Sequence, residues 1–332
     1  MFDKNYLKYY LKSKTVQQFI SGALASSVQQ DLTHKSFKHC PIIIPPLIEQ
    51  QRISHILSNL DDKIELNRRM NKTLEAIARA IFKSWFVDFD PVRAKSEGRE
   101  PAGMDAETAA LFPDSFEETE LGMVPKGWKE RTLSEFAVLN PEVWTRDTAP
   151  DQIEYIDLSN TKRGIIESTI KHQWKDAPSR ARRILRAGDS ILGTVRPGNE
   201  SYALISEEVL TGSTGFAVLR PVKREFRDYV YLAATAPANI ERLSNLADGA
   251  AYPAVSPEMI MSTQVVKIPD PIIKRFSHLT CPLLDRFAAN CKESSTLATL
   301  RDVLLPMLIS GKIRTNDVED FLRERDVHEQ DR

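Results

Sequence analysis

The stretch that decides the fold is residues 47–86, LIEQQRISHILSNLDDKIELNRRMNKTLEAIARAIFKSWF. Apolar and small residues recur in it at alternating intervals of four and three, which is the spacing of a coiled-coil seam. At 1.5 Å per residue, a helix of this length reaches roughly 60 Å and needs a partner of similar length to cover its apolar stripe. The seam residues are Ile53, Leu57, Leu60, Ile64, Leu74, Ala78, Ile81 and Trp85.

A second stretch, from about Ile272 to Ile309, supplies that partner. Polar residues interrupt both seams at the same offset of 223: Asn67 and Asn71 in the first, Asn290 and Ser294 in the second. Polar residues in a seam cost stability but specify the register, so we expect these four side chains near one polar layer of an antiparallel pair. Pro282 and Pro306 predict that the second helix starts late or kinks. Its seam residues are Phe276, Leu283, Phe287, Leu297, Leu300, Leu304 and Leu308.

The 223-residue offset extends beyond the helices. Ser54-His55 aligns with Ser277-His278, Thr73-Leu74 with Thr296-Leu297, and Ile44-Pro45 with Ile268-Pro269 after one residue of slack. Leu32–Phe37 aligns with Val255–Ile260. A long internal period of this kind indicates a duplicated unit. The second copy runs from about Pro125, whereas the first starts only at the counterpart of Arg224, so we expect roughly the first 100 residues of one copy to be missing.

These observations predict an α+β fold, built as a pseudo-repeat from a mixed α/β globular domain and two long antiparallel coiled-coil helices. The expected segments are a domain remnant (1–45), a long helix (46–88), a connector (89–124), a complete domain (125–269), a second long helix (270–312) and a charged tail (313–332).

Local patterns refine this plan. In the remnant, Thr15–Ala25 predicts a helix and Cys40–Ile44 a strand. The connector is expected to be extended, with a short helix near Asp105–Leu111. In the complete domain we expect strands at Ile153–Leu158, Ser190–Val195 and Gly215–Leu219, and a helix over Tyr229–Leu246.

Composition excludes several classes of protein. The chain has 332 residues with 45 basic and 46 acidic side chains, so it is not a generally basic nucleic-acid binder. Three cysteines without a CxxC pair favour a reducing, cytoplasmic setting. No apolar run approaches 18 residues, so we expect no membrane span. Phosphate-cradling, methyltransferase, nuclease and zinc-site motifs are absent, so we expect no catalytic residue, no metal site and no cofactor.

One cluster of basic residues in the complete domain suits contacts with DNA phosphates, which give affinity but no sequence information. The alternative is an ordinary solvated face. The cluster comprises Lys171, Lys175, Arg180, Arg182, Arg183 and Arg186.

Turn segments are better candidates for contacts with bases. Arg196-Pro197-Gly198-Asn199 carries the two side-chain types that pair bidentately with guanine and adenine. Ser213-Thr214-Gly215 offers hydroxyl groups, Gly249–Pro253 ends in the ring of Tyr252, and Lys162-Arg163-Gly164 is a weaker candidate. For each of these segments the alternative is an ordinary turn.

Residues 49–95 and 111–136 together resemble the specificity subunit of type I restriction–modification systems. The similarity covers essentially the whole chain. Its most specific motifs are Trp85–Pro91 (WFVDFDP) and Gly122–Trp128 (GMVPKGW) at the junction into the complete domain.

The resemblance implies that each target recognition domain reads one half of a bipartite site in double-stranded DNA and that the two helices set the distance between the halves. It also implies that methyltransferase subunits dock on the helices and that restriction subunits join them. S-adenosylmethionine, ATP and Mg²⁺ are then expected on these partners. With one domain reduced to a remnant, the chain is expected to read a single half-site and to pair with itself or with a second partial chain. The alternative is an inactive scaffold in which Ile42–Ile44 are exposed.

Overall fold

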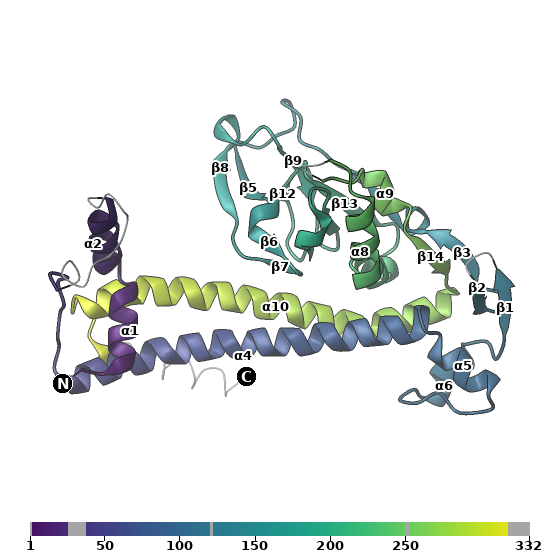
Figure 1. Ribbon diagram of the computed structural model, residues 1–332, viewed down its shortest axis with the longest axis horizontal. Coiled ribbons are helices and arrows are strands. Elements are labelled where there is room, and N and C mark those ends of the chain that lie inside the picture. The colour runs from purple at the N-terminus through teal and green to yellow at the C-terminus, as the bar shows by residue number, and fades with distance from the viewer. Residues whose placement is uncertain (1, 26–37, 120–121, 250–252, 318–332) are drawn as a thin grey trace. The chain divides into compact units, whose positions relative to one another are not determined.

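A computed structural model describes residues 2–25, 38–119, 122–249 and 253–317 (Figure 1). The chain divides into two compact units. One contains Met1–Met70 and Asn290–Arg332, and the other contains Asn71–Ala289. Both long helices run through the two units, and each unit is described below by itself.

The two long helices are α4 (Leu47–Phe86) and α10 (Asp270–Ile309). Each has 40 residues, and both ends differ by the 223-residue offset, so the predicted pair of equivalent helices is confirmed. The late start expected for the second helix is wrong, because α10 begins at Asp270 and continues past Pro282 and Pro306. Pro271 stands in its first turn, where the missing N–H has no helical partner to lose.

Within each unit, α4 and α10 are antiparallel. In the first unit Arg301 donates to Asp61 at 2.7 Å, and Lys63 lies 3.4 Å from Glu293. In the second unit the ring of Phe276 packs against Phe86 at a centroid distance of 4.8 Å. Residues late in α4 therefore contact residues early in α10, which is the antiparallel arrangement that the seams predict.

Most of the predicted seam is buried or half-buried, with one exception. Leu300 is 39% exposed, so its assignment to the seam is wrong. The neighbouring Arg301 points toward α4 and forms an ion pair with Asp61. At this level of the helix pair, Arg301 and not Leu300 makes the contact with α4. Leu304 packs on the apolar core again, and Leu308 is buried within it.

The first unit also contains α1 (Lys4–Lys12) and α2 (Lys14–Ala25). The sequence pattern predicted α2 but not α1. Tyr6, Tyr9 and Tyr10 of α1 are almost completely buried against α4 and α10. Their hydroxyl groups are satisfied: Tyr9, for example, donates to Asp61 at 2.8 Å.

The strand predicted at Cys40–Ile44 is wrong. This segment has no strand partner among the described residues, although Pro41 and Ile43 accept hydrogen bonds from Tyr10 and Tyr6. The bond from Tyr6 to Ile43, at 2.9 Å, recurs in the second unit between Tyr229 and Val266 at 3.0 Å. Both members shift by 223 residues, so the repeat holds in the tertiary structure. The alignment of Leu32–Phe37 lies outside the described residues.

The connector is more structured than the extended segment expected. It forms α5 (Asp90–Ser96), α6 (Ala106–Ala110) and a hairpin of β1 (Phe116–Thr119) with β2 (Gly122–Pro125). The short helix predicted near Asp105–Leu111 is confirmed as α6, and Asp105 caps it by accepting from the Thr108 N–H.

The complete domain contains two four-stranded sheets, ordered β11-β10-β13-β4 and β8-β5-β12-β9. The strands predicted at Ile153–Leu158, Ser190–Val195 and Gly215–Leu219 are confirmed as β5, β10 and β13, each with shifted ends. Two strands far apart in sequence, β3 and β14, pair antiparallel. The strands are β3 (Lys129–Thr132), β4 (Ala137–Leu139), β5 (Gln152–Ile156), β6 (Thr161–Lys162), β7 (Ile165–Ile166), β8 (Ile170–Gln173), β9 (Ala181–Leu185), β10 (Ser190–Gly193), β11 (Tyr202–Leu204), β12 (Leu210–Ser213), β13 (Phe216–Pro221) and β14 (Gln264–Lys267).

Three helices complete the domain: α7 (Arg227–Ala234), α8 (Pro237–Leu246) and α9 (Pro257–Met261). The helical stretch predicted over Tyr229–Leu246 is confirmed, but as two helices. The break precedes Pro237, which cannot continue the hydrogen bonding of α7 but can open α8. Tyr229 and Val230 of α7 are buried in the same apolar core as Phe86 and Phe276 of the long helices.

Candidate nucleic-acid interface

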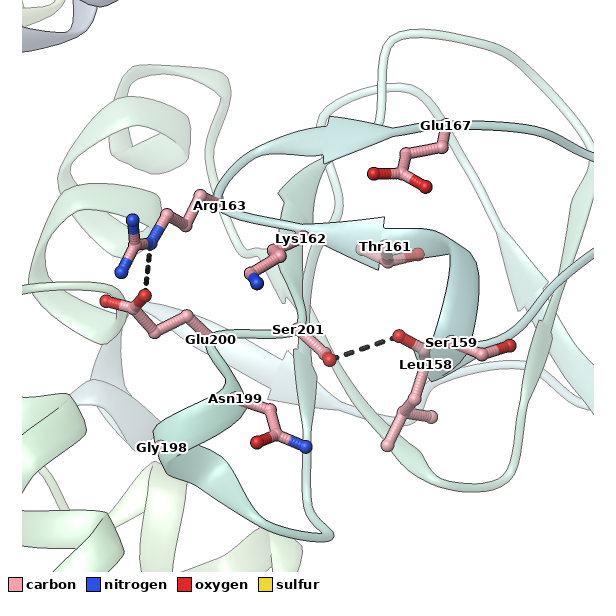
Figure 2. Close-up of a pocket in the computed structure, with 10 residues that line it drawn as sticks. All are labelled: Leu158, Ser159, Thr161, Lys162, Arg163, Glu167, Gly198, Asn199, Glu200 and Ser201. Carbon is pink, nitrogen blue, oxygen red and sulfur yellow. Dashed lines mark hydrogen bonds and ion pairs between the residues drawn. The ribbon is translucent and has the colours of Figure 1, made fainter. Parts of the chain in front are cut away.

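Two of the predicted turn segments meet at one surface cavity (Figure 2). The cavity has a volume of about 420 Å³. The β6–β7 hairpin forms one wall, and η4 (Pro197–Asn199) with the following Glu200 and Ser201 forms the other. The lining residues are Leu158, Ser159, Thr161, Lys162, Arg163, Glu167, Gly198, Asn199, Glu200 and Ser201.

Backbone hydrogen bonds hold the two walls together. The N–H of Arg163 donates to Glu200 at 2.9 Å, and the N–H of Gly164 donates to Tyr202 at 2.8 Å. A side chain at Gly164 has no room, because a Cβ there would lie 2.9 Å from the Tyr231 hydroxyl oxygen. The hairpin tip therefore packs closely against Tyr231 of α7.

Positive φ angles occur at and beside this cavity, since Arg163 and Glu200 line it and Arg196 precedes the lining residues of its turn. The φ angles of Arg163, Arg196 and Glu200 are +46°, +49° and +58°. All three lie in the left-handed region that residues with side chains disfavour. Residues held in such conformations collect at binding and active sites, where surrounding structure enforces them. The N–H of Arg196 donates to Pro253 at 2.7 Å, which fixes the turn against the following loop.

The cavity presents both donors and acceptors. Lys162 and Asn199 are exposed and project toward it from opposite walls, and the carboxylate of Glu167 lies just beyond β7, at the end of the first wall (Figure 2). Arg163 forms an ion pair with Glu200, and this hydrogen bond raises the pKa of the guanidinium group. Amide, ammonium and carboxylate groups at one cavity can read the edge of a base by its donors and acceptors.

The predicted basic cluster is only partly available. Lys171 and Lys175 are exposed on β8 and η3 (Trp174–Asp176). Arg180 forms an ion pair with Asp157 at 2.8 Å, and Arg186 pairs with Glu142 at 3.1 Å. Carboxylates of the domain thus neutralise part of the positive surface expected from the sequence.

The two remaining arginines of the cluster are half-buried. Arg182 lies over the ring of Trp174 at 4.6 Å, a cation–π contact that leaves its charge near the surface. The Nε atom of Arg183 is buried without a hydrogen-bond partner among the described residues, and burial lowers the pKa of this side chain. Arg183 is therefore poorly placed for phosphate contact.

The segment Ser213-Thr214-Gly215 does not present both of its hydroxyl groups. Ser213 is 1% exposed, and its Oγ accepts from the Gly215 N–H, so the structure does not support it as a surface contact. Thr214 is exposed and stays a candidate. Tyr252 lies outside the described residues.

The residues predicted to set the helix register are buried or half-buried. Asn67 donates to Glu293 at 2.9 Å and to Ser294 at 3.3 Å. Asn290 donates to the sulfur of Met70 at 3.6 Å. Asn67, Asn290 and Ser294 thus come together in one unit, whereas Asn71 belongs to the other, where it donates to the Phe287 carbonyl at 3.2 Å.

The acidic half of the cavity was not predicted from the sequence. Glu200 follows the Arg196–Asn199 turn directly, and Glu167 follows the Lys162-Arg163-Gly164 turn by three residues. Their closeness in sequence to predicted turns is a usable signal, but the pairing of Arg163 with Glu200 over 37 residues is not visible before folding.

Among the described residues, no group of three or more His, Cys, Asp and Glu side chains could hold a metal ion. Within the same ranges, none of the helices has the length and hydrophobicity required to cross a bilayer.

Comparison with known proteins supports the resemblance noted in the sequence. Residues 2–76 match the family described as the type I restriction modification DNA specificity domain. The HindI specificity subunit of Haemophilus influenzae is 26% identical over 329 residues, covering 85% of this chain and 71% of that protein. The MjaIX specificity subunit of Methanocaldococcus jannaschii is 24% identical, covering 94% and 70% respectively.

Among solved structures, the S subunit of the type I restriction–modification system of M. genitalium has a TM-score of 0.52 and 16% identity. The match covers 92% of this chain and 72% of that chain, and it shows a common fold. The matched domain and the related sequences support the similarity of this chain to the specificity subunits of type I restriction–modification systems.

Proposed function

We propose that this chain supplies DNA sequence recognition to a type I restriction–modification complex, and that residues 125–269 read one half of a bipartite site. The observation that carries the proposal is the convergence of the Lys162–Gly164 and Arg196–Asn199 turns at one cavity. Backbone hydrogen bonds join its two walls, residues with positive φ angles lie at it, and exposed donors and acceptors line it. Such an arrangement suits base edges better than a uniform phosphate track.

Different residues would make different contacts. Arg196 and Asn199 are the candidates for base readout, because both are exposed at one turn and both side-chain types can form bidentate pairs with bases. Lys171 and Lys175 are exposed on a neighbouring edge and are the candidates for phosphate contacts. Affinity and specificity would then depend on separate residues.

The long helices would act as the scaffold. We infer that methyltransferase subunits, and through them restriction subunits, dock on α4 and α10, and that S-adenosylmethionine, ATP and Mg²⁺ belong to those partners. This chain would then contribute recognition and spacing without a catalytic residue. Another copy of the chain, or a partial specificity chain, would be a further partner in the complex.

The test is modification-sensitive sequencing of the genome of a host that expresses the chain with its neighbouring methyltransferase. We expect a methylated split motif, palindromic if two copies assemble and asymmetric if another chain contributes. Arg196→Ala and Asn199→Ala should relax the motif at single positions, and the exposed Lys267→Ala should leave it unchanged. An unchanged motif in both turn variants would refute the base contacts, and absence of methylation by the parent chain would refute the function.

A further inference from the structure

Three strands of one sheet bring polar side chains together at the same edge. β5 and β12 are parallel neighbours, with Ile156 opposite Gly212, and β9 runs antiparallel on the other side of β12 (Figure 1). The residues that follow β5 and β12 therefore lie at the same edge as the residue that precedes β9. These three residues are Asp157, Thr214 and Arg180.

Arg180 is attached to this edge at both its backbone and its side chain. The Thr214 N–H donates to the Arg180 carbonyl at 2.8 Å, which joins the backbone of Arg180 to the end of β12. The Nη2 atom of Arg180 lies 2.8 Å from Oδ2 of Asp157, which joins the tip of the side chain to the end of β5. The direction of the guanidinium group is therefore restricted.

Asp157 is itself held by the short helix that it caps, η2 (Leu158–Asn160). Its Oδ1 atom accepts from the Leu158 N–H at 2.7 Å, and its own N–H donates to Oδ1 of Asn160 at 2.9 Å. The Asp157 side chain is 15% exposed, whereas that of Arg180 is 61% exposed. The carboxylate is thus an anchored group from which the guanidinium extends into solvent.

The exposed part of the guanidinium group has donors left for another molecule. Asp157 is the one acceptor that its nitrogens meet among the described residues. A guanidinium group has five N–H donors in a planar fork. Two of them can pair with the O6 and N7 acceptors on the major-groove edge of a guanine.

The carboxylate of Asp157 favours a base over a phosphate as the partner of Arg180. A phosphate beside Arg180 would also approach the negative charge of Asp157, and like charges repel. The edge of a guanine carries no net charge, so it gains the hydrogen bonds without this repulsion. The ion pair therefore changes the phosphate contact expected from the sequence into a base contact.

The ion pair adjoins the cavity between the two turns. Asp157 directly precedes Leu158 and Ser159, which both line the cavity (Figure 2). The turn after Thr214 packs on the same segment, because a Cβ on Gly215 would lie 2.8 Å from Cδ1 of Leu158. A duplex bound at the cavity would therefore also reach Arg180.

We propose that Arg180 is a specificity-determining residue that contacts the edge of a guanine, and that Asp157 is the positioning residue that holds its guanidinium group. The inference rests on the proposed function and adds one defined base to it. It also predicts that this part of the domain enters the major groove, since only that groove presents O6 and N7 of guanine.

The test is selection of bound duplexes from a library of random sequence. The full-length chain, in complex with its neighbouring methyltransferase, is mixed with the library, and the bound duplexes are sequenced. We expect Arg180→Ala and Arg180→Lys to lower the preference for guanine at one position by about fivefold or more and to keep the rest of the motif. Arg180→Lys keeps the positive charge, so its affinity for unrelated duplexes should stay at the parental value.

A further variant tests the positioning role. Asp157→Asn keeps an oxygen for the Leu158 N–H but removes the charge that holds the guanidinium group. We expect it to weaken the preference for guanine at the same position as the Arg180 variants do. For unrelated duplexes, the slope of log K against log salt concentration should become steeper by about 0.9, because the released Arg180 can reach a phosphate. A purely structural role of Asp157 would not change this slope.

Arg99→Ala is the matched control, because Arg99 is 62% exposed and forms an ion pair with Glu97 in the connector. It should keep the whole motif, and every variant should keep the parental unfolding midpoint.

The outcomes separate this inference from the proposed function. If the parent complex enriches a motif and Arg180→Ala leaves it intact, or relaxes it at a base other than guanine, the inference fails and the proposed function stands. If Asp157→Asn keeps the parental guanine preference and salt slope, the positioning role fails. A parent complex that enriches no sequence would overturn the inference together with the proposed function.

Discussion

The guanidinium group of Arg79, on the long helix α4, donates a hydrogen bond of 3.0 Å to the carbonyl oxygen of Thr235, the residue that caps α7. The same group donates to the Thr235 hydroxyl at 3.2 Å and to the Tyr202 hydroxyl at 3.3 Å, and it pairs with Glu75 at 2.8 Å. A cation at the C-terminus of a helix is favoured by the helix dipole. One half-buried side chain thus joins the spacer helix to a helix and a strand of the recognition domain.

Arg79→Lys should lower the free energy of unfolding by about 2–3 kcal/mol, because a lysine cannot satisfy the separate acceptors that the planar guanidinium reaches. Urea denaturation monitored by tryptophan fluorescence measures this change. The matched control is Arg69→Lys on the same helix, where the ion pair with Glu65 is exposed and a change below about 0.5 kcal/mol is expected. Equal effects of the two substitutions would show that Arg79 does not join the two elements.

The buried Asn67 should specify register at a cost in stability. Its Oδ1 atom is buried without a hydrogen-bond partner among the described residues. Asn67→Leu should therefore leave the free energy of unfolding unchanged or raise it by about 1 kcal/mol, while it weakens the preference for one register. A loss of stability greater than about 1 kcal/mol would contradict this interpretation.

The register itself can be measured by cysteine cross-linking. Lys63→Cys with Glu293→Cys marks the observed register, because these side chains form an ion pair at 3.4 Å. Lys63→Cys with Leu300→Cys marks a shift of one heptad. We expect the shifted pair to cross-link only when Asn67→Leu is present, whereas trapping of the shifted pair in the parent background would refute the role of Asn67.

The ion pairs of Glu142 should make the free energy of unfolding fall in acid. Hydrogen bonds from Arg186 and Arg220 lower the pKa of its carboxyl group from 4.5 to about 2. Because the folded-state pKa lies below the unfolded value, the contribution of Glu142 is fully present above about pH 4.5 and is lost as the pH falls toward 2. Glu142→Gln should reduce the slope of unfolding free energy against pH within this window.

Denaturant titrations between pH 2 and 7 measure that slope. The exposed Glu241→Gln serves as the control and should keep the parental profile. If Glu142→Gln and the parent lose stability in parallel across the window, the two ion pairs of Glu142 do not account for its acid sensitivity.

Lys171 and Lys175 should contribute affinity for DNA without sequence preference. Each phosphate contact that is lost should reduce the slope of log K against log salt concentration by about 0.9. We therefore expect Lys171→Ala and Lys175→Ala to weaken binding equally for specific and unrelated duplexes, as measured by anisotropy titrations at several salt concentrations. Lys267→Ala provides the control, and a change in sequence preference in either variant would contradict a phosphate role.

The sequence was sufficient to predict structure wherever local periodicity and the repeat agreed. The α4 and α10 helices end where the pattern predicts. The reason is that residues spaced by four and three lie on one face only when the chain is helical. The pattern was insufficient where contacts over long distances override it. Leu300 fits the spacing but is exposed, while the neighbouring Arg301 forms an ion pair with Asp61 of the facing helix.

The binding surface shows the same division. The exposed turns around Arg196 and Lys162 could be predicted from the turn-forming residues Gly, Pro and Asn, whose effect depends on local backbone preferences. The burial of Ser213 and the neutralisation of Arg180 and Arg186 by carboxylates could not, because each depends on a neighbour brought in by sheet formation.

The sequence by itself therefore determined the two equivalent long helices, the repeat and the family resemblance, since all three depend on residue types at regular spacing. Only the tertiary structure decided that two turns meet at one cavity and that Arg180 pairs with Asp157. The physical reason is that burial and charge pairing are properties of neighbours in space. Tyr6 and Ile43, for example, are 37 residues apart in sequence and become neighbours only in the folded chain.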